Sequence, residues 1–292
     1  MTPRFVHLCL HSEYSLIDSM VRIKPLVAAA AARRMAAVAN TDRSNLFSMV
    51  KFYRAATAAG RKPIIGVDAL LRNRDDANKP YRLLLLVRNR RGYQNLTRLV
   101  SRSYREGQHL GKAMMEPQWF SQSCDGLIAI APCHESDVGQ ALLANRQDLA
   151  AEHAASWRSH FPGGYFLGVS RTGRRDEEDA LHLLVDFAQQ QQLPVVAHND
   201  VRFLNKEDFE AHEVRVCIHD GRTLDDPRRQ KLYTEQQYLR SEEEMCELFA
   251  DLPVALQNSV EIAKCCNLEL TLGRNVLPEF PVPQGMTTET FF

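Results

Sequence analysis

Seven short runs rich in apolar and β-branched residues alternate with stretches of helical periodicity along the first 200 residues. The runs are 5–11, 36–42, 62–71, 82–87, 126–132, 165–169 and 193–200. The helical patterns lie near 22–34, 45–59, 92–105, 137–160, 176–191 and 206–217. Uninterrupted apolar runs of this length are typical of parallel strands buried on both faces. Seven of them predict an α/β protein whose sheet is a closed or nearly closed β/α barrel rather than an open sheet.

The pattern changes after Cys217. A charged, turn-rich stretch is followed by two predicted helices over 241–252 and 252–266, the first with Ser241 as its cap. We therefore expect three parts, namely a barrel over 1–217, a short helical extension packing on it over 218–272, and the start of a linker over 273–292. A helix start at Thr287–Thr288 just before Phe292 predicts that the natural chain continues further.

Charge and cysteine content exclude several classes of protein. Lys plus Arg and Asp plus Glu both total 36, so the chain as a whole has no cationic field for holding duplex DNA. No apolar run approaches the roughly 18 residues of a membrane span. The seven cysteines form no CxxC pair, which argues against a disulfide scaffold and a zinc finger. A cytoplasmic protein is expected.

Polar residues gather at the predicted strand ends, where β/α folds place their functional groups. The candidates are His7, Cys9, His11, Asp18, Asp42, Arg43, Asp68, Arg82, Cys133, Gly168, Asp200 and Arg202. Residues 7, 9 and 11 alternate along one strand, so an H-x-C-x-H triplet on one face, with a carboxylate shortly after, is a candidate metal site. The alternative is that these side chains pack or hydrogen-bond in the core.

Three arginines favour that alternative. Arg43, Arg82 and Arg202 stand where a metal cluster would need ligands, and a guanidinium has no lone pair to offer. Together with the four aspartates they predict a buried salt-bridge network in which the arginines take the positive role of metal ions. His134–Glu135 and His212–Glu213 lack the spacing of a zinc-protease motif. His212 and Glu213 lie on a predicted helix and are expected to be surface or interhelical contacts.

A third interpretation concerns 88–105, RNRRGYQNLTRLVSRSYR. Arg91, Arg98, Arg102 and Arg105 have a spacing that places them on one stripe of a helix, with Arg90 nearby. The stripe is either a DNA-binding surface or an ordinary solvated helix face.

Several segments resemble a known family: FVHLCLHSEYSLIDS (5–19), ANTDRSNLFSMVKFYRAATAAGRKPIIGVDALL (39–71), LPVVAHNDVRFLNKEDFEAHEV (193–214) and LPEFPVPQG (277–285). In this order they resemble the N-terminal PHP (polymerase and histidinol phosphatase) domains of bacterial DNA polymerase III alpha subunits, from about residue 4 to 284. The resemblance implies a distorted seven-stranded β/α barrel that precedes a polymerase palm.

The resemblance also implies the origin of the strand-end residues. Metal-competent members of the family hold three metal ions with nine ligands. His11, Asp18, Cys133 and Asp200 match that pattern; Asp68 stands for a glutamate and Cys9 for a histidine; Arg43, Arg82 and Arg202 replace three histidines. These nine positions are therefore expected to be vestigial, as in the degenerate branch of the family.

The implied role is that of a catalytically inactive module. It would support the polymerase core of a DNA-directed DNA polymerase and dock a separate proofreading exonuclease subunit, alongside other replisome subunits. No cofactor is expected in this region, whereas magnesium would belong to the palm, and DNA would bind through the parent polymerase. The alternative is a residual metal-dependent phosphoesterase, a 3′–5′ exonuclease or pyrophosphatase, with one metal held by Cys9, His11, Asp18 and Cys133.

Overall fold

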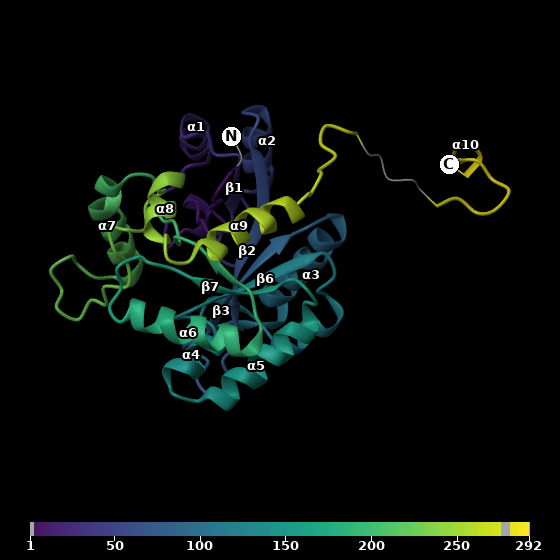
Figure 1. Ribbon diagram of the computed structural model, residues 1–292. Helices are drawn as coiled ribbons and strands as arrows, with labels where there is room; N and C mark the ends of the chain where they lie inside the picture. The colour runs from purple at the N-terminus through teal and green to yellow at the C-terminus, as the bar shows by residue number, and fades with distance from the viewer. Residues whose placement is uncertain (1–2, 276–280, 292) are drawn as a thin grey trace.

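A computed structural model describes residues 3–275 and 281–291 (Figure 1). The strands are β1 (Ala37–Asn40), β2 (Lys62–Leu71), β3 (Tyr81–Val87), β4 (Gln108–His109), β5 (Lys112–Met115), β6 (Leu127–Pro132), β7 (Tyr165–Val169) and β8 (Val195–Ala197). Along the sheet, β1 pairs with β2, and β2, β3, β6, β7 and β8 follow in that order. The small hairpin β4–β5, which the sequence did not predict, pairs with the end of β2.

The N-terminal segment 5–11 closes this sheet into a barrel. On one side the amides of Ala39 and Thr41 donate to the carbonyls of His7 (2.9 Å) and Leu10 (2.8 Å). On the other side Val201, just after β8, exchanges backbone hydrogen bonds with the segment, donating to the Cys9 carbonyl and accepting from the His11 amide (3.1 Å each). Together with this segment, seven extended segments form the wall of the barrel. The predicted seven-stranded distorted barrel is confirmed.

One strand runs against the expectation of an all-parallel barrel. β3 is antiparallel to both β2 and β6. The reason is local: only residues 72–80 connect β2 to β3, which is a loop rather than the helical crossover that parallel neighbours require. As a consequence the first residues of β3 lie at the same rim as the ends of β2, and Arg82 pairs in register with Leu70.

The helices follow the predicted pattern closely. They are α1 (Ile23–Ala32), α2 (Met49–Ala58), α3 (Arg90–Glu106), α4 (Asp137–Leu143), α5 (Gln147–His160), α6 (Glu177–Gln191), α7 (Phe209–Asp220), α8 (Glu242–Leu248), α9 (Pro253–Cys265) and α10 (Thr288–Phe291), with 3-10 turns η1 (Glu13–Ser15), η2 (Pro117–Gln122) and η3 (Lys206–Asp208). The single helix expected over 137–160 is two helices, because the chain turns at Asn145 with a positive φ of 56°. Helices α2, α3, α4 and α6 pack on the outside of the barrel.

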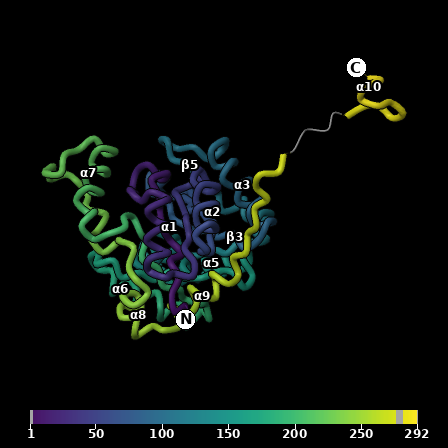
Figure 2. Tube along the Cα trace, turned by 90° about the horizontal axis from the view of Figure 1, so that it is seen from above, coloured from purple at the N-terminus to yellow at the C-terminus, as the bar shows by residue number. Residues whose placement is uncertain are grey.

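Apolar side chains form two separate layers. Inside the barrel lie residues such as Ile64, Leu84 and Ile130, while a larger cluster fills the space between the sheet and the outer helices. Helix α9 closes one end of the interior: Asn258 donates to the Val195 carbonyl, and residues of the same helix belong to the inner cluster. Figure 2 shows α8 and α9 together at that end and β5 at the opposite one.

The part of the chain after Cys217 therefore includes an element that the barrel needs, since α9 packs on β8. The predicted boundaries at 217 and 272 stay predictions. The predicted helix start at Thr287–Thr288 corresponds to α10. Within 3–275 and 281–291, none of the helices combines the length and apolar character that crossing a membrane requires.

Candidate functional site at the barrel mouth

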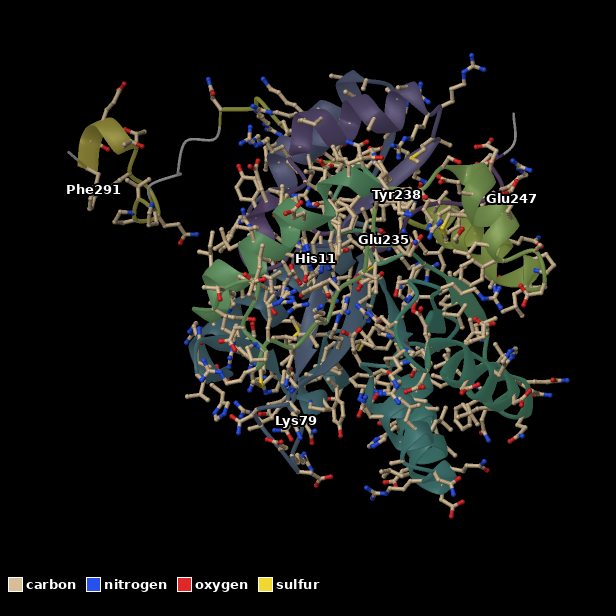
Figure 3. All side chains as sticks on the ribbon, turned by 90° about the vertical axis from the view of Figure 1, so that its left-hand side faces the viewer. His11, Lys79, Glu235, Tyr238, Glu247 and Phe291 are labelled. Carbon is tan, nitrogen blue, oxygen red and sulfur yellow. The ribbon has the colours of Figure 1, made fainter. Side chains whose placement is uncertain are left out.

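The end of the barrel opposite α9 holds a cluster of charged side chains, most of them buried, which we call the mouth network. It comprises His11, Asp18, Arg43, Asp68, Arg82, Glu135, Arg174, Asp200 and Arg202. They come from the N-terminal segment, the loop after η1, the ends of β1, β2, β6 and β7, the start of β3, and the stretch after β8, which supplies both Asp200 and Arg202. Barrel closure brings them to one rim, and Figure 3 shows His11 inside the fold.

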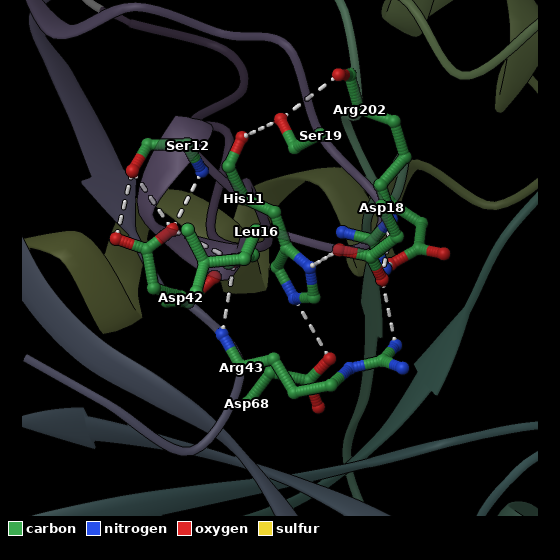
Figure 4. A network of polar contacts seen from close by, with 12 residues as sticks. His11, Ser12, Leu16, Asp18, Ser19, Asp42, Arg43, Asp68 and Arg202 are labelled. Atoms are coloured by element: carbon green, nitrogen blue, oxygen red, sulfur yellow. Dashed lines mark hydrogen bonds and ion pairs between the residues drawn. The ribbon is translucent and has the colours of Figure 1, made fainter. Parts of the chain in front are cut away.

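His11 joins two of the carboxylates. Its Nδ1 lies 2.8 Å from Oδ1 of Asp18 and its Nε2 lies 2.9 Å from Oδ2 of Asp68, with all three side chains fully buried (Figure 4). Both ring nitrogens are thus engaged by carboxylates. Neither is directed at a position that a metal ion could occupy without displacing one of them.

The arginines occupy the spaces between the carboxylates. Arg82 bridges three of them, with Nη2 2.6 Å from Asp68 Oδ2 and 3.0 Å from Asp200 Oδ1, and Nη1 2.5 Å from Glu135 Oε2. Arg202, fully buried, places Nη2 2.7 Å from Asp200 Oδ1.

The remaining two arginines close the network at its edges. Nη2 of Arg43 lies 2.9 Å from Asp18 Oδ2, as Figure 4 shows, and Nη2 of Arg174 lies 3.1 Å from Asp200 Oδ2. Four guanidinium groups therefore face four carboxylates. Three of the four aspartates expected in this network are present in it.

Electrostatics keep the aspartates of the network ionised. Burial alone raises the pKa of Asp18, but Arg43, His11 and Arg202 outweigh burial and hold that pKa well below its usual range. The pKa of Asp68 is lowered in the same way, chiefly by Arg82 against the effect of burial. Burial also raises the pKa of Asp200, but Arg202, Arg82 and Arg174 outweigh burial and hold that pKa well below its usual value. These three aspartates are therefore ionised at neutral pH, as are the arginines beside them.

The residues present do not fit the metal cluster that the fold suggests. Three of the nine expected ligand positions hold guanidinium groups that point at the carboxylates a metal would need. The Cys9 thiol donates to Asp200 Oδ1 (3.2 Å), and burial raises its pKa well above the usual value, so the thiolate that a soft metal prefers is disfavoured. In the described ranges no three His, Cys, Asp or Glu side chains are grouped so as to hold a metal ion.

The expectation that residues 7, 9 and 11 share a face is wrong. Ala39 and Thr41, two residues apart, bond to His7 and Leu10, three residues apart, so the N-terminal segment carries an extra residue as a β-bulge does. The bulge breaks the alternation of side chains. His7 turns away from the mouth, with its Nε2 2.9 Å from the Arg240 carbonyl oxygen.

Two further candidates lie outside the mouth network. Asp42, expected to pair with arginine, instead accepts hydrogen bonds from the hydroxyls of Ser12, Ser15 and Ser48. These bonds fix the turn after β1, and Asp42 forms no ion pair with the residues that the structure describes. The Cys133 thiol donates to the Ala180 carbonyl (3.3 Å) and packs in the outer layer, and burial raises its pKa to about 12.

The structure also places three further candidates. A Cβ at Gly168 would lie 3.0 Å from Nε2 of His198, so a side chain there would require a small shift of its neighbours. His212 and Glu213, expected near the surface or between helices, are buried, and the Nε2 of His212 lies 3.0 Å from the Asp18 carbonyl oxygen. His212 therefore supports the loop that carries Asp18.

Sequence reasoning missed several members of the mouth network. Glu135 follows β6 by three residues and Arg174 follows β7 by five, so both lie in strand-end loops that the same reasoning could have searched more widely. Tyr233 (hydroxyl 3.3 Å from Asp18 Oδ2) and Gln237 (Nε2 3.1 Å from Asp200 Oδ2) come from the stretch between α7 and α8. No local pattern marks that stretch as part of the site.

A cavity of about 540 Å³ opens above the mouth network. The four arginines and Lys112 line it, whereas Glu135 is the only carboxylate among its lining residues in the described part of the chain. The three aspartates lie beneath the guanidinium groups. The arrangement therefore offers positive charge to the cavity, and Glu135 there is paired with Arg82 and Arg174.

Comparison with known proteins identifies the family to which the chain belongs. A family model described as "PHP domain" matches residues 7–172. The chain belongs to the PHP domain family. The resemblance seen in the sequence is thereby confirmed.

Relatives of this PHP domain place it more narrowly. It is 50% identical over 291 residues to DNA polymerase III subunit alpha of Pseudomonas aeruginosa and 49% identical over 289 residues to the same subunit of Escherichia coli K12. These alignments cover 100% and 99% of the chain but 25% of each relative. The chain thus spans about a quarter of the length of the curated relatives it matches.

Solved structures give more distant matches. An amidohydrolase from Chromobacterium violaceum is 15% identical, with 72% of this chain and 96% of that chain covered and a TM-score of 0.45. A two-domain protein from Bacteroides vulgatus with a PHP-like domain is 11% identical, with 93% and 72% covered and a TM-score of 0.44.

Proposed function

We propose that this PHP domain is a catalytically inactive structural module of a replicative DNA polymerase alpha subunit. It supports the polymerase core and docks a proofreading exonuclease subunit. The observation that carries the proposal is the pairing of Arg82 and Arg202 with the carboxylates Asp68 and Asp200. Those contacts fill the mouth with protein charge where a metallo-phosphoesterase would hold its ions.

Electrostatics supports the absence of metal chemistry. A divalent cation entering the mouth would meet four guanidinium groups within the same cluster and would have to displace them from their carboxylates. Breaking a buried ion pair costs about 3–5 kcal/mol. Without a bound cation there is nothing in the cluster to lower the pKa of a water and generate the nucleophile of a phosphoesterase.

The wider setting of the module is part of the same proposal. The relatives that match along the whole chain are four times its length, and their name is that of a DNA polymerase subunit. Polymerisation, its magnesium ions and the binding of primer and template would then belong to the other three quarters of such a protein. The module would work in the cytoplasm among the other subunits of the replisome.

Metal content tests the inactive-site proposal directly. The chain is purified without chelator, dialysed against zinc and manganese, and measured by inductively coupled plasma mass spectrometry. We expect well under one ion per chain after washing, and no hydrolysis of bis-p-nitrophenyl phosphate or pyrophosphate. One or more tightly held ions per chain would contradict the proposal and favour the residual phosphoesterase, with Cys9→Ala and His11→Ala as the variants that should then lose the metal.

Docking needs its own measurement. Isothermal titration of the chain with the purified exonuclease subunit of the same organism should show one-to-one binding. Absence of heat and of co-elution at tens of micromolar would remove the docking role while leaving the inactive site untouched. The two parts of the proposal can thus fail separately.

A further inference from the structure

Helix α3 and the residues just before it carry an unusual concentration of exposed arginine. Between 88 and 105 the chain has six arginines and no carboxylate, although the whole sequence balances 36 cations with 36 anions. All six side chains lie at the surface: Arg88, Arg90, Arg91, Arg98, Arg102 and Arg105. We call this set the α3 arginine face.

Most of these arginines have no anionic partner. Arg102 pairs with Glu106 (2.6 Å) and lies over the Trp119 ring, 4.3 Å from its centroid. Arg98 reaches only the amide oxygen of Asn95, at 3.4 Å. In the described part of the chain the other four members of the face form no ion pair, so their charge is free to attract an external anion.

The helix holds these charges in a line. Arg91, Arg98, Arg102 and Arg105 fall within one narrow stripe, since 3.6 residues make a turn, and the stripe is about 21 Å long at 1.5 Å per residue. Leu96 and Leu99, on another side of the helix, are buried, and α3 packs on β3, β5 and β6, so the helix is fixed. At its start the Asn89 side chain accepts from the Gly92 amide (3.1 Å) as an N-cap.

The composition of the face distinguishes between classes of partner. A protein interface of ordinary affinity has an apolar centre, whereas the exposed positions from 88 to 105 are arginine, asparagine, glutamine and serine, with Tyr104 as their one aromatic residue. Nucleic acid is the polyanion that such a surface fits, because a duplex carries one phosphate for about every 1.7 Å of its axis, or about twelve along 21 Å.

We propose that the α3 arginine face binds the phosphate backbone of nucleic acid. The contact goes beyond the structural and docking role proposed above, and does not depend on it. Because contacts to the phosphate backbone carry no sequence information, such binding is independent of sequence and falls steeply with salt.

The test is binding of fluorescein-labelled 30-mer DNA, single-stranded and duplex, to the 292-residue chain, followed by anisotropy from 50 to 200 mM NaCl. The variant is Arg91→Gln/Arg98→Gln/Arg105→Gln. Its control is Lys24→Gln/Arg54→Gln/Arg158→Gln, which removes the same charge from exposed positions on α1, α2 and α5 that form no ion pair in the described ranges. We expect the control to bind like the unaltered chain, and the α3 variant to bind at least tenfold more weakly at 50 mM NaCl.

The salt dependence sharpens the result. Removing three phosphate contacts should flatten the slope of log K against log salt by roughly 2–3 for duplex DNA. Chemical modification of the unaltered chain tests the same contact without requiring that a variant folds. Bound DNA should protect Arg91, Arg98 and Arg105 from modification by phenylglyoxal, as measured by mass spectrometry. Arg54 should stay reactive.

Three outcomes would overturn the proposal. The first is equal loss of binding in the two triple variants, and the second is no binding of either DNA at 200 µM chain and 50 mM NaCl. The third is competition by poly-glutamate as effective as that by DNA of equal charge, which would assign the face to an acidic protein instead.

Discussion

The PHP domain uses arginine in two opposite ways. At the barrel mouth Arg82 and Arg202 are buried and bound to carboxylates of the same chain. On α3 the arginines are exposed, and Arg91 and Arg105 have no ion pair in the described residues. The side chain and its charge are the same, so the difference lies in what the fold places beside it. A guanidinium enclosed with carboxylates belongs to the structure, whereas one left without them is available to a partner.

The largest expected effect comes from removing a buried arginine. Arg202→Ala leaves Asp200 without its closest partner in the interior and should lower the free energy of unfolding by about 3–5 kcal/mol. Urea unfolding followed by circular dichroism measures the change. The matched control is Arg105→Ala on α3, which should stay within about 0.5 kcal/mol of the unaltered chain.

An unchanged midpoint for Arg202→Ala would mean that its guanidinium is hydrated rather than buried. In that case the contrast between the two groups of arginines would disappear, and with it the physical basis of the inactive-site proposal.

Acid should weaken the mouth and leave α3 unaffected. Asp18, Asp68 and Asp200 have pKa values below those of the unfolded chain, so the stability they contribute is complete above about pH 4 and is lost as the pH falls through their folded pKa values. For one salt-bridged aspartate the loss is about 2–3 kcal/mol. Urea unfolding at intervals from pH 7 to pH 2 should show it.

Two variants locate the acid effect. Asp68→Asn should flatten the profile below pH 4, because one of the groups that must be protonated is already neutral. The exposed Asp125→Asn should leave the profile unchanged. If the stability of both variants depends on pH in the same way, the acid transition does not originate in the mouth.

The sequence predicts the barrel well and the mouth only in part. The seven strand runs are local patterns of apolar residues, which is why they could be recognised one by one. The direction of β3 depends on which strands pair, and the bulge between His7 and Leu10 depends on the register against β1. Neither has a local signature.

The partners of the charged side chains in the mouth also depend on tertiary contacts, which the sequence predicts only in part. Arg82 was a correct candidate, although it lies at the start of its strand rather than at the end. Asp42 was predicted to pair with arginine on charge alone, but in the folded chain three serine hydroxyls donate hydrogen bonds to its carboxylate. A carboxylate can be satisfied by any donor, so composition cannot distinguish an ion pair from a set of hydrogen bonds.

A smaller effect, of the opposite sign, is expected on α3. Arg98 and Arg102 are like charges four residues apart, which destabilises a helix slightly. Replacing the first by glutamate, Arg98→Glu, creates an attractive pair in the favoured order and should raise the stability by about 0.5 kcal/mol. Thermal melting measures the gain, with Arg98→Gln expected between the two. A clear loss of stability would show that Arg98 has a structural role and that the face is not spare charge.

High salt gives the smallest expected effect on the mouth and separates the two groups of arginines. The Debye length falls from about 10 Å at 0.1 M to about 3 Å at 1 M, which screens exposed charges and hardly affects buried ones. In 1 M NaCl the loss caused by Arg202→Ala should therefore change by less than about 0.5 kcal/mol, while the gain from Arg98→Glu should vanish. Urea unfolding of both variants at 0.1 M and 1 M NaCl measures the change in the free energy of unfolding that each variant causes at each salt concentration. If salt removes both effects together, the mouth is as hydrated as α3, and the fold does not divide its arginines between structure and recognition.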